Sequence, residues 1–339
     1  MLVTQQLEMI KAQCKALSPL VVINCITYNH EPYIRDTLEG FVRQKTKFAF
    51  VAIVHDDAST DDTALIIREY AKKYPDIIKP IYEEENQYSK RDGSLTRIMN
   101  EACRATGAKY VAICEGDDYW IDPLKLQKQV DFLEANPKYG MCYTKVQRYY
   151  QRFSKLGEIW GGDNVTFSDL LRINTIPTLT TLFRQNLVEL YYEEINPCNK
   201  KWKMGDYPIW LFFAHESKIK FIDEVTGIYR VLDNSASHCK DYIKQLEFSN
   251  SSYRIKKYMI EYFKEEYPVI MNEINIKESY INMRIAILNN QSSDKYILIF
   301  RHTFWHTSLS IFQRLKLLPW VIWPKFLSKT AYKRFSAKL

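Results

Sequence analysis

The chain has 339 residues, of which 46% are hydrophobic and 26% are charged, and this composition excludes collagen-like, low-complexity and disordered proteins. The net charge of +7 is uneven, because residues 295–339 hold nine Lys and Arg and no acid, and subtracting these nine charges leaves −2 for residues 1–294. No run of 18 apolar residues, signal-peptide pattern or Cys-x-x-Cys pair occurs, so we expect a protein of a reducing compartment with no ordinary spanning helix and no structural zinc site.

Apolar runs alternate with helical patterns over the first 114 residues. Strands are expected at 20–26, 48–54 and 109–114, where β-branched residues cluster. Helices are expected at 33–43 and 64–74, and a third helix closes at Gly107. This order predicts an α/β fold with a doubly wound, mostly parallel sheet.

The later part of the chain gives weaker signals. Asp122 and Pro123 are typical of a helix start, and the helix is expected to stop at 136–137. We interpret residues 143–238 as the other half of the same domain. Residues 241–294 have an amphipathic helical pattern.

Polar and acidic residues follow each expected strand, at 27–30, 55–57 and 115–118. In parallel sheets, ligands bind beyond these strand ends. Carboxylates gathered there repel one another unless a cation lies between them, and a hard divalent ion usually takes one or two carboxylates plus substrate phosphates. The pattern suggests displacement at a phosphate ester, with a metal stabilising a diphosphate leaving group.

Several other chemistries lose support because their motifs are absent. The chain has no Gly-x-Gly-x-x-Gly after the first strand, no P-loop and no Gly-x-Ser-x-Gly elbow. Ala58 stands where an aspartyl-phosphate enzyme would place a second acid.

Three segments in this order, 21–29, 54–61 and 110–120, resemble family 2 glycosyltransferases with the GT-A fold. The resemblance covers about residues 19–238. It implies a Rossmann-like, mostly parallel sheet flanked by helices. A helical C-terminal extension is expected separately, from the amphipathic pattern at 241–294. The resemblance implies a nucleotide-sugar donor, by default a UDP-sugar with GDP- and dTDP-sugars as alternatives, and inversion at the anomeric carbon.

The resemblance also assigns roles to individual residues. Those expected to bind the nucleotide sugar are Thr27, Tyr28, Asn29, Asp57, Glu115, Gly116, Asp117 and Arg230, with Asp57 accepting a hydrogen bond from the base. Mn²⁺ or Mg²⁺ is expected on Asp117 or Asp118, and His238 is a further candidate ligand. Asp206, in the segment 204–208, is expected to be the catalytic base.

We therefore expect a catalytic domain at 1–240 and a helical extension at 241–339. The expected function is transfer of a sugar to a hydroxyl of a glycan or lipid-linked acceptor, in cell-surface polysaccharide or lipopolysaccharide synthesis. The alternatives are a sugar-phosphate nucleotidyltransferase, which would normally carry a Gly-rich basic loop after its first strand, and an inactive nucleotide-sugar-binding protein. No nucleic-acid partner is expected.

The basic tail interleaves its cations with Trp, Phe and Leu, whereas Pro319 and Pro324 interrupt it. This composition is typical of a segment that lies on an anionic membrane surface and does not span the membrane. We expect a cytoplasmic protein held at the inner face of the membrane; alternatively, the tail packs on the catalytic domain.

Overall fold

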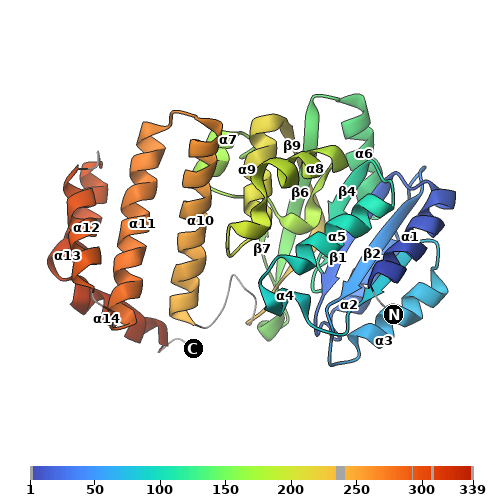
Figure 1. The fold of residues 1–339 in the computed structure, drawn as a ribbon, viewed down its shortest axis with the longest axis horizontal. Helices are drawn as coiled ribbons and strands as arrows, with labels where there is room; N and C mark the ends of the chain where they lie inside the picture. Colours follow the sequence, from blue (N-terminus) through green and yellow to red (C-terminus); the bar gives the residue numbers. More distant parts are fainter. Residues whose placement is uncertain (1–2, 234–240, 292, 307–308, 337–339) are drawn as a thin grey trace. The chain divides into compact units, whose positions relative to one another are not determined.

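The computed structural model describes residues 3–233, 241–291, 293–306 and 309–336, and the chain forms two compact units (Figure 1). The first unit contains the residues up to 201 together with 212–231. The second contains 202–211 and the residues from 232 onward.

One sheet forms the centre of the first unit. The nine strands found in the described residues are β1 (Val21–Thr27), β2 (Phe50–Asp56), β3 (Ile78–Tyr82), β4 (Tyr110–Ile113), β5 (Tyr119–Trp120), β6 (Tyr139–Tyr150), β7 (Lys155–Trp160), β8 (Leu182–Arg184) and β9 (Lys218–Val231). Their order is β3-β2-β1-β4-β8-β6-β9-β5, and β7 pairs with β6.

Strands β3, β2, β1 and β4 are parallel, which places their carboxyl ends along one edge. Every residue of β2 is buried, as expected for a strand covered on both faces. The three strands predicted from the sequence are therefore confirmed. The other half of the sheet is mixed, because β8 pairs antiparallel with β4 and β6, whereas β6 and β9 are parallel.

Helices cover this sheet (Figure 1). They are α1 (Val3–Leu17), α2 (Ile34–Val42), α3 (Thr63–Lys73), α4 (Gln87–Lys90), α5 (Ser94–Ala105), α6 (Lys125–Ala135), α7 (Phe167–Arg172) and α8 (Gln185–Ile195). Phe41 of α2, Ile67 of α3 and Leu126 of α6 belong to the main hydrophobic core. Helices α2 and α3 match the predicted helices, so the expected α/β fold is confirmed. The sheet is less parallel than expected, because β4–β8, β5–β9, β6–β7 and β6–β8 pair antiparallel.

Helix α1 was not predicted, and it packs on β3, the outermost strand of the sheet order. The side-chain amide of Gln6 donates to the carbonyl of Tyr82 at 3.0 Å and accepts from its N–H at 2.9 Å. A side chain therefore satisfies the backbone polar groups that a neighbouring strand would otherwise bind.

The second unit is helical. It contains α10 (Tyr242–Phe263), α11 (Pro268–Leu288), α12 (Asp294–His306), α13 (Ile311–Ile322) and α14 (Pro324–Ser336), and α9 (Asp206–Glu216) begins in it. Met283 of α11, Phe300 and Phe304 of α12, and Val321 of α13 are buried in one core. None of the described helices is both long and apolar enough to cross a membrane.

Candidate functional site

The loop after β1 lies against the loop after β2. Asn29 has a left-handed backbone with φ of 54°, its N–H donates to Ser59 Oγ at 2.9 Å, and its side-chain oxygen accepts from the N–H of Thr60 at 2.8 Å. Thr27 is buried and its hydroxyl donates to the carbonyl of His55 at 3.1 Å. Tyr28 is 44% exposed, so its ring is accessible to a ligand. Three residues predicted to border the nucleotide thus lie in one fixed loop.

Asp57 is buried, and its carboxylate caps a short helix. Its oxygens accept the N–H of Gln87 at 2.6 Å and the N–H of Tyr88 at 3.0 Å. Both contacts lie at the start of α4, about thirty residues along the chain. Asp57 therefore ties the loop after β2 to the start of α4. Its predicted hydrogen bond to the base of the nucleotide stays a prediction.

Two further polar residues at this edge received no role from the sequence. Asp56 is 3% exposed, burial raises its pKa, and its Oδ1 has no hydrogen-bond partner among the described residues. His30 Nδ1 also has no hydrogen-bond partner among the described residues, and burial lowers the pKa of the His30 imidazole. The only signal for either residue was its position directly after a predicted strand.

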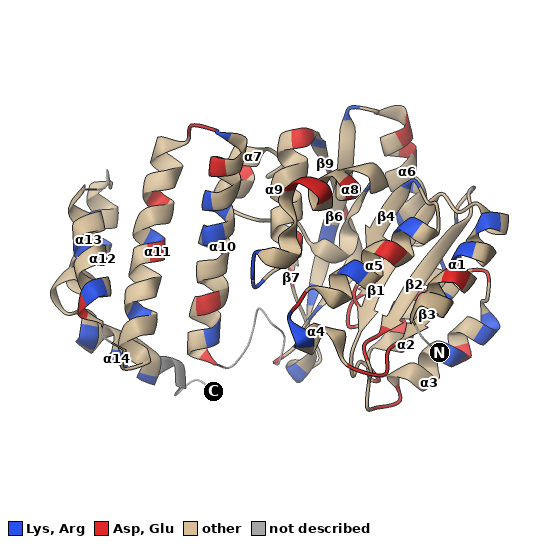
Figure 2. Cartoon of the chain, in the orientation of Figure 1, with Lys and Arg blue, Asp and Glu red and all other residues tan. Residues whose placement is uncertain are grey.

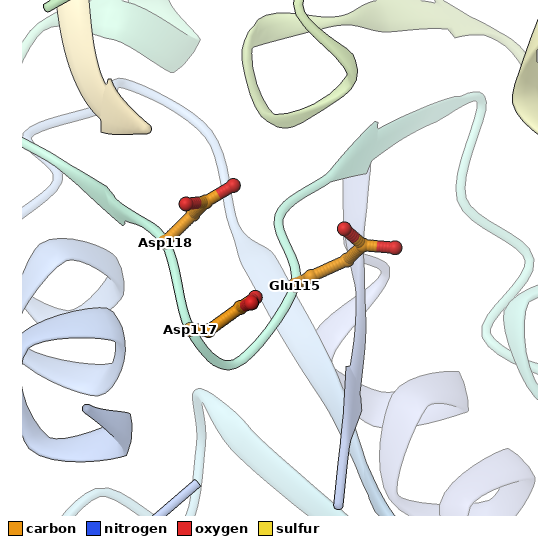
Figure 3. Close-up of side chains that lie close together, drawn as sticks. All are labelled: Glu115, Asp117 and Asp118. Carbon is orange, nitrogen blue, oxygen red and sulfur yellow. The ribbon is translucent and has the colours of Figure 1, made fainter. Parts of the chain in front are cut away.

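The loop after β4 brings three carboxylates together (Figure 3). One carboxylate oxygen from each of Glu115, Asp117 and Asp118 lies within 4.8 Å of the others. Glu115 is exposed, Asp117 is half-buried and Asp118 is 2% exposed. Burial, followed by the charge of Asp117, raises the pKa of Asp118 well above its ordinary value. A divalent cation with oxygen ligands would relieve this repulsion, so the donor set fits Mn²⁺ or Mg²⁺.

Close packing fixes the backbone of this loop. The N–H of Gly116 donates to the carbonyl of Ile26 at 3.0 Å, which ties the loop to β1. A Cβ at Gly116 would lie 2.4 Å from Thr27 Cγ2 and 2.8 Å from His30 Nδ1. The buried Thr37 hydroxyl of α2 lies 3.0 Å from the carbonyl of Gly116 and 2.7 Å from that of Asp118. Only glycine therefore fits at 116 without moving the loop after β1.

Arg230, near the end of β9, contacts the same loop. Its main-chain N–H donates to Asp118 Oδ1 at 2.7 Å, and its Nη1 donates to the carbonyl of Asp117 at 2.7 Å. Its Nη2 pairs with the carboxylate of Asp36. The contact with a diphosphate that the sequence suggests for Arg230 stays a prediction.

Asp206 and His238 are the other two predicted site residues. Asp206 is the first residue of α9, belongs to the second unit, and accepts the N–H of Tyr207 at 2.7 Å through Oδ1. Its role as a base stays a prediction. His238 lies outside the described residues.

The sequence is similar to a protein family and to several known proteins. The model of the family described as glycosyl transferase family 2 matches residues 23–189. An uncharacterized protein of Mycobacterium tuberculosis is 35% identical over 209 residues, which are 60% of this chain and 57% of that protein. The match thus spans little more than half of that relative. Glycosyltransferase TuaG of Bacillus subtilis, provisionally assigned to teichuronic acid biosynthesis, is 28% identical over 225 residues, covering 66% of this chain and 83% of TuaG.

Among solved structures, the chain is similar to residues 1–349 of Staphylococcus aureus TarS in complex with UDP-GlcNAc. The TM-score is 0.58 at 16% sequence identity, and the superposition covers 94% of this chain and 90% of that chain. At this identity the likeness concerns the fold alone, and it supports the GT-A type architecture expected from the sequence.

Proposed function

Residues 23–189 place this chain in glycosyltransferase family 2, and on this basis we propose that it transfers a sugar from a nucleotide-sugar donor to an acceptor hydroxyl. The observation that carries the proposal is the carboxylate cluster at the end of β4, held against the loop that follows β1. We propose that residues 1–240, which include Asp206, carry the catalytic machinery, and that the helices from residue 241 onward are an extension.

The donor is proposed to be a UDP-sugar, bound beyond the carboxyl ends of β1, β2 and β4. Support for UDP comes from the fold shared with TarS, which was solved with UDP-GlcNAc. Asp117 and Asp118 would hold Mn²⁺ or Mg²⁺, with Glu115 beside them, and His238 stays a candidate ligand. When bound, the cation would neutralise charge on the departing nucleoside diphosphate.

The chemical step is proposed to invert the anomeric carbon. The acceptor oxygen forms a bond to that carbon while the bond to the diphosphate oxygen breaks, and the carboxylate of Asp206 takes the acceptor proton. Support for Asp206 comes from the resemblance of the segment 204–208 to the acidic motif of the family, and its half-buried side chain lies at the first residue of α9.

The acceptor is proposed to be a glycan or a lipid-linked glycan of a cell-surface polysaccharide. The name of TuaG, a relative matched over 66% of this chain, supports a polysaccharide acceptor. An anionic membrane surface is the proposed partner of the second unit.

An apolar stripe on α13 supports the membrane proposal. Ile311, Phe312, Leu315 and Ile322 are spaced so that they share one helix face, and they are 76%, 79%, 61% and 49% exposed. Cations accompany them on α12 to α14 (Figure 2). Apolar side chains facing water beside Lys and Arg are typical of segments that lie in the headgroup region of anionic bilayers. We accordingly propose location at the cytoplasmic face of the membrane.

The catalytic proposal is tested by titrating UDP and UDP-sugars in the presence and absence of Mn²⁺. We expect Asp117→Ala or Asp118→Ala to abolish the metal-dependent part of binding. Asp131→Ala, which removes an exposed carboxylate from α6, is the matched control and should bind as the wild type does. Metal-dependent binding that survives in both cluster variants would contradict the site.

The membrane proposal is tested by sedimentation with anionic vesicles at low and high salt. Deleting the tail is unsuitable, because Phe300 and Phe304 belong to the core of the second unit. The double variant Phe312→Ser, Leu315→Ser removes only exposed apolar groups and should pellet less. Equal pelleting of variant and wild type, or none of either, would refute the proposal.

A further inference from the structure

We propose that Arg230 is a positioning residue that sets the geometry of the carboxylate cluster, rather than a residue that contacts the diphosphate. This inference rests on the proposed function, because it concerns the proposed metal site. It follows from where the hydrogen-bond donors of Arg230 lie in the first unit.

One residue of β9, Arg230, holds two of the three carboxylate-bearing residues of the loop. The main-chain N–H of Arg230 fixes one carboxylate oxygen of Asp118, and its guanidinium fixes the main-chain carbonyl of Asp117, each at 2.7 Å. Thr37 lies within hydrogen-bond distance of the carbonyls of Gly116 and Asp118. Together, Arg230 and Thr37 thus contact three consecutive carbonyls of the loop, which leaves its backbone little freedom to move.

Two tyrosine rings enclose the guanidinium of Arg230. Its central carbon lies 4.5 Å from the ring centre of Tyr119 and 5.3 Å from that of Tyr33, and the side chain of Arg230 is 5% exposed. Cation–π contacts of this kind are strongest where the cation is shielded from water. A side chain so enclosed is well placed to support the loop and poorly placed to follow a ligand.

Asp36 compensates the positive charge of Arg230, which would otherwise repel a metal ion at the carboxylate cluster. A lone guanidinium beside Asp117 and Asp118 would cancel part of their charge and weaken cation binding. The carboxylate of Asp36, in the first turn of α2, pairs with Arg230 and compensates its charge. The cluster consequently keeps its three acidic groups for a divalent ion.

Lysine cannot replace arginine here. The planar guanidinium donates in two directions at once, to Asp117 and to Asp36, and it stacks on aromatic rings, whereas an ammonium is a compact point charge on a flexible stem. Arg230→Lys therefore keeps the charge and loses the geometry. Arg184→Lys is the matched control, because Arg184 also lies on a strand, donates to the carbonyls of Leu133 and Tyr139, and lies over a tyrosine ring.

The experiment measures Mn²⁺ binding to the full chain without nucleotide, by water-proton relaxation, together with thermal unfolding and turnover. We expect the dissociation constant for Mn²⁺ to rise about tenfold or more in Arg230→Lys, which is the loss of roughly one charge-assisted hydrogen bond. It should rise several-fold in Asp36→Asn, and stay within about twofold in Arg184→Lys even if that variant melts earlier.

Three results would overturn the inference. Unchanged Mn²⁺ affinity with weaker UDP binding in Arg230→Lys would show that Arg230 contacts the diphosphate, and the proposed function would stand. Equal losses in Arg230→Lys and Arg184→Lys, in step with their melting temperatures, would show a general structural role. A wild-type protein that binds no Mn²⁺ would overturn the inference alone if it transfers sugar, and the proposed function as well if it does not.

Discussion

Lys125 is fully buried in the core of the first unit, which makes the stability of that unit depend on pH. Its Nζ donates to Gln129 Oε1 at 2.8 Å and lies 4.1 Å from the ring centre of Trp120. The titratable groups that face it are Cys114, Cys142 and Asp122. Burial lowers the pKa of Lys125 from 10.5 to about 7.

The sign of the effect follows from which state binds the proton. Between pH 7 and 10.5 the unfolded chain keeps the Lys125 proton and the folded state does not, so the free energy of unfolding rises with pH. The unfavourable contribution of Lys125 to the free energy of unfolding is complete below pH 7 and absent above pH 10.5. It amounts to about 4 kcal/mol at pH 7.5 and about 1.4 kcal/mol at pH 9.5, so roughly 2.5 kcal/mol is regained between them.

Lys125→Met should remove this dependence. The variant loses the bond to Gln129, which costs about 1–3 kcal/mol, so it should be more stable than the wild type by roughly 2 kcal/mol at pH 7.5. Between pH 7.5 and pH 9.5, the free energy of unfolding of the variant should rise by about 2.5 kcal/mol less than that of the wild type. Hydrogen exchange of β1 and β4 peptides, corrected for intrinsic rates, reports the first unit alone.

Lys128→Met is the control on the same helix. Lys128 pairs with Asp122 and Glu224, and these partners raise its pKa, so its removal should leave the pH dependence between 7.5 and 9.5 unchanged. A Lys125→Met variant that keeps the wild-type pH dependence would refute the reasoning.

Two further predictions concern the site. Gly116→Ala should destabilise the first unit by about 1–3 kcal/mol and weaken Mn²⁺-dependent UDP binding, because its Cβ would strike Thr27 and His30. Gly107→Ala meets no atom within 4 Å but has φ of +70°, so it should cost about 1 kcal/mol and leave UDP binding intact; equal binding losses in calorimetric titrations would contradict this. Asp206→Asn should bind donor normally and lose about 10²-fold or more in turnover, and turnover within a few-fold of wild type in a sugar-transfer assay would place the base elsewhere.

The parallel half of the sheet was predictable because its strands bury both faces. The runs 20–26, 48–54 and 109–114 are continuous and β-branched, so they agree with β1, β2 and β4 to within a few residues. Strand β3 was missed, because Lys79 and Pro80 interrupt its apolar pattern, and proline in a sheet is tolerated at an edge. Helix α1 was missed because only Gln6, Ile10 and Cys14 of its residues are buried.

In the candidate site, the acidic cluster was predictable and its support was not. Glu115, Asp117 and Asp118 are neighbours in the chain, so a short motif identifies them. The bond from Arg230 to Asp36 joins residues 194 positions apart, and no local pattern encodes such a pair. Asp57 likewise finds its helix-capping contacts some thirty residues away.

The hydrogen bonds from Gln6 to Tyr82 affect how the protein can be shortened. The family match begins at residue 23, so a fragment cut to that boundary would lack α1 and uncover the outer edge of β3. Bare strand edges recruit strands from other molecules, which leads to aggregation. Fragments that begin after α1 should therefore precipitate although every residue of the carboxylate cluster is present, so α1 is best kept as part of the folded unit.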